Sequence, residues 1–162
     1  MSDAVPTDPE SETAVSESGS APAEDSAADE ARAGAVLQAR VADCLARYGI
    51  PVRTEDEALG FEYDGTLCSL RAVTLVPGLD VLTFTGVLAW DRPLKPQLHK
   101  KVADRNAGLQ FGTITVIARA KQLADIVLRY TFPAGGLDDE ALTTMLLLVL
   151  SGAGQARKGL IP

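Results

Sequence analysis

Residues 90–117, WDRPLKPQLHKKVADRNAGLQFGTITVI, decide the fold, because they place one short helix between two blocks of strand-like sequence. Two prolines suit the start of this helix, and Leu94, Leu98 and Val102 follow at intervals of four residues. These three side chains should face a sheet, and Gly108 should end the helix before a new strand begins.

The sequence before this helix predicts three antiparallel strands. Residues 61–63 and 66–73 flank Asp64-Gly65, a pair that tolerates the positive φ angles of a type I′ hairpin turn. A second turn at residues 77–80 leads into residues 81–90, which are apolar on both sides.

Two further strands and two outer helices complete the predicted domain. The strands cover residues 111–120 and 126–132, and an amphipathic helix over residues 33–48 precedes all the others. With a closing helix after Asp138, the order is α-β-β-β-α-β-β-α. The predicted fold class is therefore α+β, with a five-stranded antiparallel sheet packed against helices.

The closing helix is unusually apolar. Asp138 is the expected N-cap, and the following segment, DEALTTMLLLVLSGAG, leaves almost no polar face. The apolar run is too short to span a bilayer, which takes roughly 20 residues. A second subunit, complete burial within one chain, or membrane contact would each cover it. We expect a homodimer, and the candidate surface consists of Met145, Leu146, Val149 and Leu150.

The charge of the chain is concentrated at its start. Residues 1–30 hold nine acids and no Lys or Arg, which leaves 13 acids against 15 bases in the remainder. This polar segment lacks the apolar side chains that a packed core needs, so we expect residues 1–31 to be disordered and residues 32–162 to form the domain. The tail would act either as a solubilising leader or in regulation. The tail does not resemble a signal peptide, and we therefore expect a cytoplasmic protein.

The sequence contains no complete catalytic, cofactor-binding or metal-binding set. His99 is the single histidine and has no neighbouring nucleophile or orienting carboxylate in its local motif. Cys44 and Cys68 lack metal-ligand spacing and should be buried reduced thiols. The segment GAGQARKG follows a helix and matches neither common nucleotide-binding pattern. We therefore expect no enzyme activity, no cofactor and no metal.

Basic residues on the central helix form a second candidate partner surface. Lys95, Lys100, Lys101 and Arg105 are close in sequence, although helical spacing distributes them around the helix. A solvated face is the simplest interpretation, and docking of an acidic partner is the alternative. The domain lacks the strong basic excess of a nucleic-acid-binding protein. Trp90 has two interpretations: it is either a further contact residue for a partner or an anchor in the core.

Three features resemble the YbjN family, whose members are proposed sensory transduction regulators with a type III secretion chaperone-like fold. They are the hairpin FEYDGTLCSL, the helix ending in Arg105-Asn106 before Phe111-Gly112, and the Leu-rich helix after Leu137-Asp138-Asp139. The resemblance covers about residues 35–155. It implies a dimer that binds segments of other proteins, and the Ala- and Arg-rich composition suggests a bacterial source.

The expected function is that of a non-enzymatic protein-binding module, chaperone-like or regulatory, acting as a homodimer without nucleic acid or membrane insertion. The alternative is a small-ligand sensor or enzyme with a pocket between helix and sheet.

Overall fold

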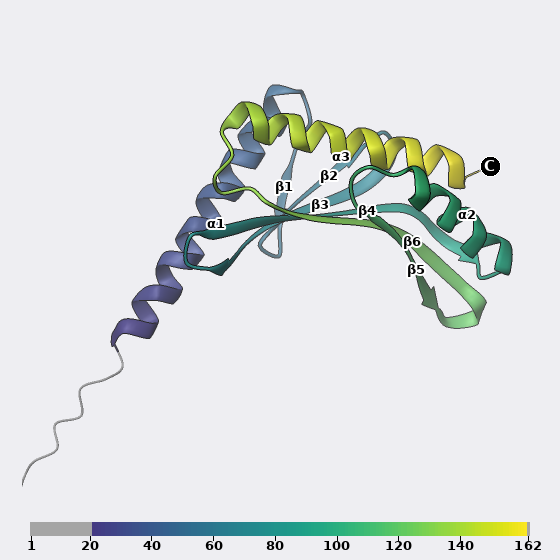
Figure 1. The fold of residues 1–162 in the computed structure, drawn as a ribbon, viewed down its shortest axis with the longest axis horizontal. Coiled ribbons are helices and arrows are strands. Elements are labelled where there is room, and N and C mark those ends of the chain that lie inside the picture. Colours follow the sequence, from purple (N-terminus) through teal and green to yellow (C-terminus); the bar gives the residue numbers. More distant parts are fainter. Residues whose placement is uncertain (1–20, 162) are drawn as a thin grey trace, which may run out of the picture.

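The computed structural model describes residues 21–161. Figure 1 shows one antiparallel sheet with three helices. In chain order the elements are α1 (Ala21–Arg47), β1 (Arg53–Glu55), β2 (Ala58–Tyr63), β3 (Thr66–Val76), β4 (Leu79–Pro93), α2 (Pro96–Gly108), β5 (Thr113–Arg119), β6 (Leu123–Pro133) and α3 (Asp139–Leu160). A short 3-10 turn, Ala120–Gln122, joins β5 to β6.

The sheet has six strands in the order β1-β2-β3-β4-β6-β5, and every neighbouring pair is antiparallel. The α+β class is confirmed, but the prediction of five strands was wrong. The missed strand, β1, consists of three exposed residues, Arg-Thr-Glu, and so lacks the apolar alternation that marks a strand in sequence. The type I′ turn is confirmed, because Asp64 and Gly65 have φ angles of 47° and 72°.

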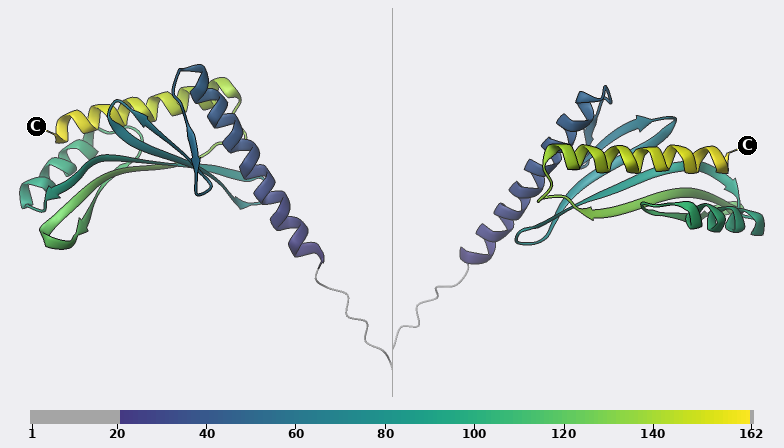
Figure 2. Two further views of the ribbon diagram at one scale, coloured as in Figure 1. Left: turned by 180° about the vertical axis from the view of Figure 1, so that it is seen from behind. Right: turned by 45° about the horizontal axis from the view of Figure 1, so that its top comes forward.

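All three helices lie on one face of the sheet (Figures 1 and 2). Paired residues of neighbouring strands share a face, and one such row joins Cys68, Gly86, Leu128 and Ile114 across β3, β4, β6 and β5. These rows and the apolar stripes of the helices form the hydrophobic core. Figure 1 shows α3 running along the sheet, with α1 and α2 at opposite ends of the molecule.

Helix α1 is longer than the sequence predicted. It begins at Ala21, twelve residues before the expected start at residue 33, and it ends near the predicted break at Gly49. Its first half is rich in alanine, a strong helix former, and Ser26 Oγ donates to Glu30 Oε1 one turn further on at 3.2 Å. Residues 21–31 are therefore helical, and the rest of the tail expected to be disordered lies outside the described residues.

Helix α3 continues through the glycines that were expected to follow it and ends at Leu160. Its N-cap is confirmed, because Asp138 Oδ1 accepts from the N–H of Ala141 at 2.8 Å. The extra turns complete a mostly polar outer stripe of six exposed residues: Glu140, Thr144, Leu148, Ser151, Gln155 and Lys158. Helix α3 is thus amphipathic rather than apolar on all sides.

The candidate dimer surface on α3 needs correction for the same reason. Leu146, Val149 and Leu150 are buried in the core of their own chain, and Met145 is half-buried against it. These side chains do not form a free surface, since the sheet covers them. Within residues 21–161 no helix has both the length and the apolar character needed to cross a membrane.

Candidate protein-interaction surface

The sheet face turned away from the helices, which we call the helix-free face, carries an apolar strip. Leu67, Val87 and Val127 are paired in register across β3, β4 and β6, with Thr115 next on β5. Leu67 is 52% exposed although it is a leucine in a strand, whereas Val127 is only 5% exposed without a helix above it. Within the strip Val127 is therefore covered, and Leu67 at the β3 end is the apolar side chain exposed to solvent.

Two β-bulges in β4 shape one end of this strip. The register with β6 passes from Val87 opposite Val127 to Ala89 opposite Ile126, and then to Arg92 opposite Ala124. Strand β4 thus has one extra residue at each step. At the second bulge Trp90 and Asp91 both stand opposite Asp125, and Asp91 has a left-handed φ angle of 49°.

A buried carboxylate holds this second bulge in place. Oδ1 of Asp125 accepts the backbone N–H of Asp91 at 3.0 Å, and Oδ2 pairs with Arg119 Nη1 at 2.8 Å. The Asp125 side chain is 10% exposed, so both of its oxygens are satisfied inside the protein. Non-glycine residues with left-handed backbone cost free energy and are often found at functional sites.

Trp90 is displayed on the surface by this arrangement. It is 52% exposed, so its interpretation as a core anchor was wrong, and its candidacy as a contact residue remains. The bulge changes the alternation of side chains along β4, which a sequence pattern with a period of two cannot predict. Ile117, on β5 opposite Asp125, adds a second exposed apolar side chain at this end of the face.

The basic residues of α2 do not gather into one patch. Lys95, Lys100 and Lys101 are all exposed, and Lys100 pairs with Asp104 at 3.5 Å one turn along the helix. The guanidinium of Arg105 lies against Gly159 in the last turn of α3, where a cation suits the negative end of the helix dipole. Arg105 therefore reaches from α2 to α3, and a Cβ at residue 159 would require its side chain to move.

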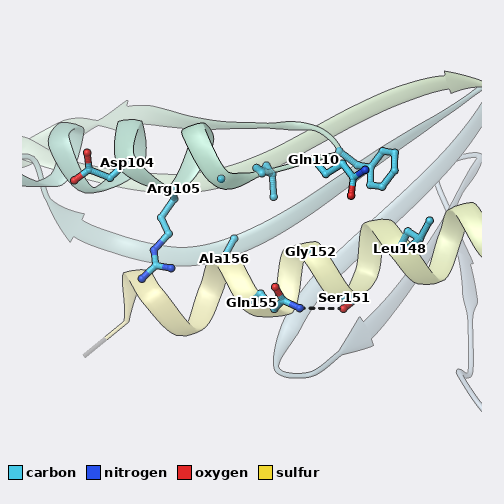
Figure 3. Close-up of a pocket in the computed structure, with 11 residues that line it drawn as sticks. Asp104, Arg105, Gln110, Leu148, Ser151, Gly152, Gln155 and Ala156 are labelled. Atoms are coloured by element: carbon cyan, nitrogen blue, oxygen red, sulfur yellow. Dashed lines mark hydrogen bonds between the residues drawn. The ribbon is translucent and has the colours of Figure 1, made fainter.

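A cleft of about 310 Å³ lies between α2 and α3, bordered by the loop that follows α2. Figure 3 shows Arg105 and Gln110 on one side, and Leu148, Ser151 and Gln155 on the other. Leu148, at 44% exposed, is the large apolar side chain that α3 presents to solvent, and it lines this cleft. This cleft lies between two helices, whereas the alternative site was expected between helix and sheet. A cavity of about 520 Å³ does lie between α1 and β3, with Gly34, Gln38 and Ala72 in its lining.

His99, Cys44 and Cys68 lie on three different elements, α2, α1 and β3. His99 is exposed on α2, and residues 21–161 contain no group of three or more His, Cys, Asp or Glu side chains that would hold a metal ion. Cys44 and Cys68 are buried as free thiols, and burial raises the pKa of Cys68 to about 12. A thiol with so high a pKa is a poor nucleophile near neutral pH.

The predicted surface residues thus belong to three separate places. Trp90 lies on the helix-free face, the lysines lie around α2, and the leucines of α3 lie in the core. Sequence reasoning missed Leu67, Val87 and Ile117, because an apolar residue in a strand is ordinarily assigned to the core.

Comparison with known proteins finds a similar fold among solved structures. No protein-family model matches the chain, and no curated protein matches it. Among solved structures, YbjN from E. coli, a proposed transcription regulator, matches with a TM-score of 0.53 and 14% identity, over 72% of this chain and 87% of that chain. The fold is YbjN-like. The resemblance seen in the sequence is therefore confirmed for the fold, which is all that so low an identity supports.

Proposed function

We propose that this chain is a non-enzymatic protein-binding module, a chaperone-like or regulatory adaptor, that binds its partners through the helix-free face. The observation that carries the proposal is the exposure of Trp90 and Leu67 on a sheet face without a covering layer. Aromatic side chains dominate the energetics of protein interfaces, and a rigid bulge lowers the conformational entropy lost on binding. The fold of a proposed regulator agrees with this role.

Binding by this face is expected to occur in the cytoplasm. The homodimer expected from the sequence also remains part of the proposal, but the α3 residues Leu146, Val149 and Leu150 are not available for it, because they are in the core. In this proposal the symmetric contact uses the helix-free face instead. Sedimentation or light scattering of the purified chain measures the oligomeric state.

The experiment is a comparison of partner retention by the immobilised protein in extract of its own cells. The variants Trp90→Ala and Leu67→Lys alter the helix-free face, and Leu148→Lys is a matched control in the cleft. Loss of the same proteins with the first two variants, and their retention by the control, would support the proposal. Retention by all three variants would contradict it.

The second candidate function is that of a small-ligand sensor using the cleft between α2 and α3. The observation in its favour is the cleft volume of about 310 Å³, at the lower end of the range for ligand pockets. This function predicts the opposite pattern: Leu148→Lys abolishes binding of the small ligand, and the two helix-free-face variants retain it.

A further inference from the structure

The free edges of the sheet differ in how they are protected. Exposed strand edges present unpaired backbone groups, which can accept an additional strand unless they are short, charged or covered. The outer edge of the sheet at β1 is only three residues long, and Arg53 and Glu55 place charges at both ends of it. This edge is thus protected by its length and its charge.

Helix α1 covers a second edge, formed where β3 extends beyond its pairing with β2. That pairing ends at Leu70, so the following residues of β3 have no strand on this side. Gln38 of α1 accepts the N–H of Ala72 at 3.1 Å, and Thr74 Oγ1 donates to the carbonyl of Glu30 at 3.0 Å. Side chains and backbone of α1 therefore take the place of the missing strand.

The third edge, at β5, is only partly closed. The side-chain amide of Asn106 pairs with both the N–H and the carbonyl of Ile114. These two backbone groups therefore point outward, away from β6. Because the direction of the backbone N–H and carbonyl groups alternates along a strand, those of Val116 and Ala118 also point outward. No backbone hydrogen bond to these two residues is made from outside the β5–β6 pair within residues 21–161.

The side chains beside this open edge suit an interaction. Ile117 is 38% exposed and lies on the helix-free face, in the row that contains Asp125 and the Trp90 bulge. The turn from β5 to β6 holds Lys121 and Gln122 with left-handed φ angles of 64° and 59°, a conformation unusual for either residue type. This end of the sheet is therefore both apolar and held in a strained shape.

The net charge around β5 and α2 indicates which kind of partner would bind there. Residues 91–129 contain eight Lys and Arg against three acids. Within residues 21–161, Arg92, Lys95 and Lys121 make no salt bridge. A second copy paired edge to edge would bring two basic ends together and be repelled, whereas an acidic segment would be attracted.

We propose that the open edge of β5 takes an acidic segment of a partner protein as an added strand, with an apolar side chain of that segment beside Ile117. Strand addition supplies affinity through backbone hydrogen bonds and specificity through alternate side chains. The inference rests on the proposed function and states which chemistry the partner offers and where it lies.

The test uses a synthetic peptide of alternating glutamate and valine, titrated into the full chain by isothermal calorimetry. Two matched peptides separate the contributions: one replaces glutamate with lysine, and the other is N-methylated at its central residues, which removes the N–H donors and keeps the side chains. We expect binding by the first peptide, and affinities at least about tenfold lower for both controls, the scale of one or two lost hydrogen bonds or of reversed charges. Equal binding of the methylated peptide would overturn strand addition.

Protein variants locate the bound strand. Ala118→Pro removes an outward N–H and leaves the bonds to β6, since proline is tolerated on the outer side of an edge strand. We expect it to weaken the Glu–Val peptide by about tenfold or more, while Ala118→Val, which keeps the N–H, binds within about twofold. Lys121→Glu should also weaken binding, whereas Arg53→Glu, the same charge change at the other end of the sheet, should not.

The outcomes separate this inference from the proposed function. If Trp90→Ala abolishes binding of the Glu–Val peptide while Ala118→Pro does not, the helix-free face binds the peptide and the added strand is refuted. If the wild-type chain binds no Glu–Val peptide at millimolar concentration, the acidic strand is refuted, and partner retention by the Trp90 and Leu67 variants still tests the proposed function. If Ala118→Pro is unfolded by circular dichroism, the methylated peptide on the wild-type chain decides the question.

Discussion

The side-chain amide of Asn106 pairs with both backbone groups of Ile114, donating to its carbonyl at 2.9 Å and accepting its N–H at 2.8 Å. A neighbouring strand would make the same two bonds, so the last turn of α2 closes one position of the β5 edge. This contact joins α2 to the sheet in the segment that first indicated the fold.

Replacement of Asn106 by alanine should destabilise the protein by about 1–3 kcal/mol, because each hydrogen bond contributes about 1 kcal/mol and its loss leaves two backbone groups unpaired. Urea unfolding measures the change. Gln110→Ala is the control, since Gln110 makes no side-chain hydrogen bond within the described residues. An equal effect of both substitutions would show that the amide pairing has no special role. In the wild type the amide hydrogen of Ile114 should exchange more slowly than those of Val116 and Ala118.

The Asp125 carboxylate should control the position of Trp90. Asp125→Ala removes the acceptor of the Asp91 N–H and the partner of Arg119, so we expect about 2–3 kcal/mol of destabilisation and altered acrylamide quenching of Trp90, the single tryptophan. Arg119→Ala leaves Oδ2 of the buried Asp125 without its partner but keeps the bond to the Asp91 N–H, so it should cost about 1–3 kcal/mol and leave the quenching unchanged. Unchanged quenching in Asp125→Ala would mean that the bulge does not need the carboxylate.

Burial of Cys68 should make stability depend on alkaline pH. The pKa of the folded thiol is raised from 9.0 to about 12, chiefly by desolvation and further by the nearby carboxylate of Glu62. The protonated thiol is thus favoured in the fold, and its contribution is present below pH 9.0 and lost as the pH rises toward about 12. We expect a loss of about 1.4 kcal/mol per pH unit in that interval, absent from Cys68→Ala. Equal slopes for the two proteins, in urea unfolding at each pH, would contradict this.

Residues 1–20 are predicted to compete with an acidic partner for the basic end of the sheet. They hold five acids and no base, so they carry the charge that the basic end attracts. A chain that starts at residue 21 keeps the whole of α1 and should bind the Glu–Val peptide about two- to tenfold more tightly at low ionic strength, with no difference in about 0.5 M salt. Full-length protein with those five acids changed to their amides is the matched control and should behave like the truncated chain. Equal affinities at both salt concentrations would refute competition.

Much of the fold followed from local patterns in the sequence. The Asp64-Gly65 turn, the Asp138 cap and the spacing of Leu98 and Val102 are each produced by near neighbours, and the structure has all of them. Strand β1 was missed because its pairing depends on β2 and not on its own three polar residues.

The candidate site depended on contacts that sequence spacing does not encode. Trp90 is exposed because β4 has extra residues opposite β6, and Asp125 supports them from thirty-four positions along the chain. Leu146, Val149 and Leu150 looked like an interface because α3 was expected to end before its polar stripe was complete. Pairing between distant strands and the true length of a helix decide such questions.

The central claim is that proteins bind the helix-free face, and site-specific photocrosslinking in the cells that make this protein tests it most directly. A photoreactive amino acid at Leu67 or Trp90 should yield crosslinks to other proteins, and the same group at Leu148, which is comparably exposed in the cleft, should not. Crosslinks from Leu148 alone, or none from either position on the helix-free face, would contradict the account.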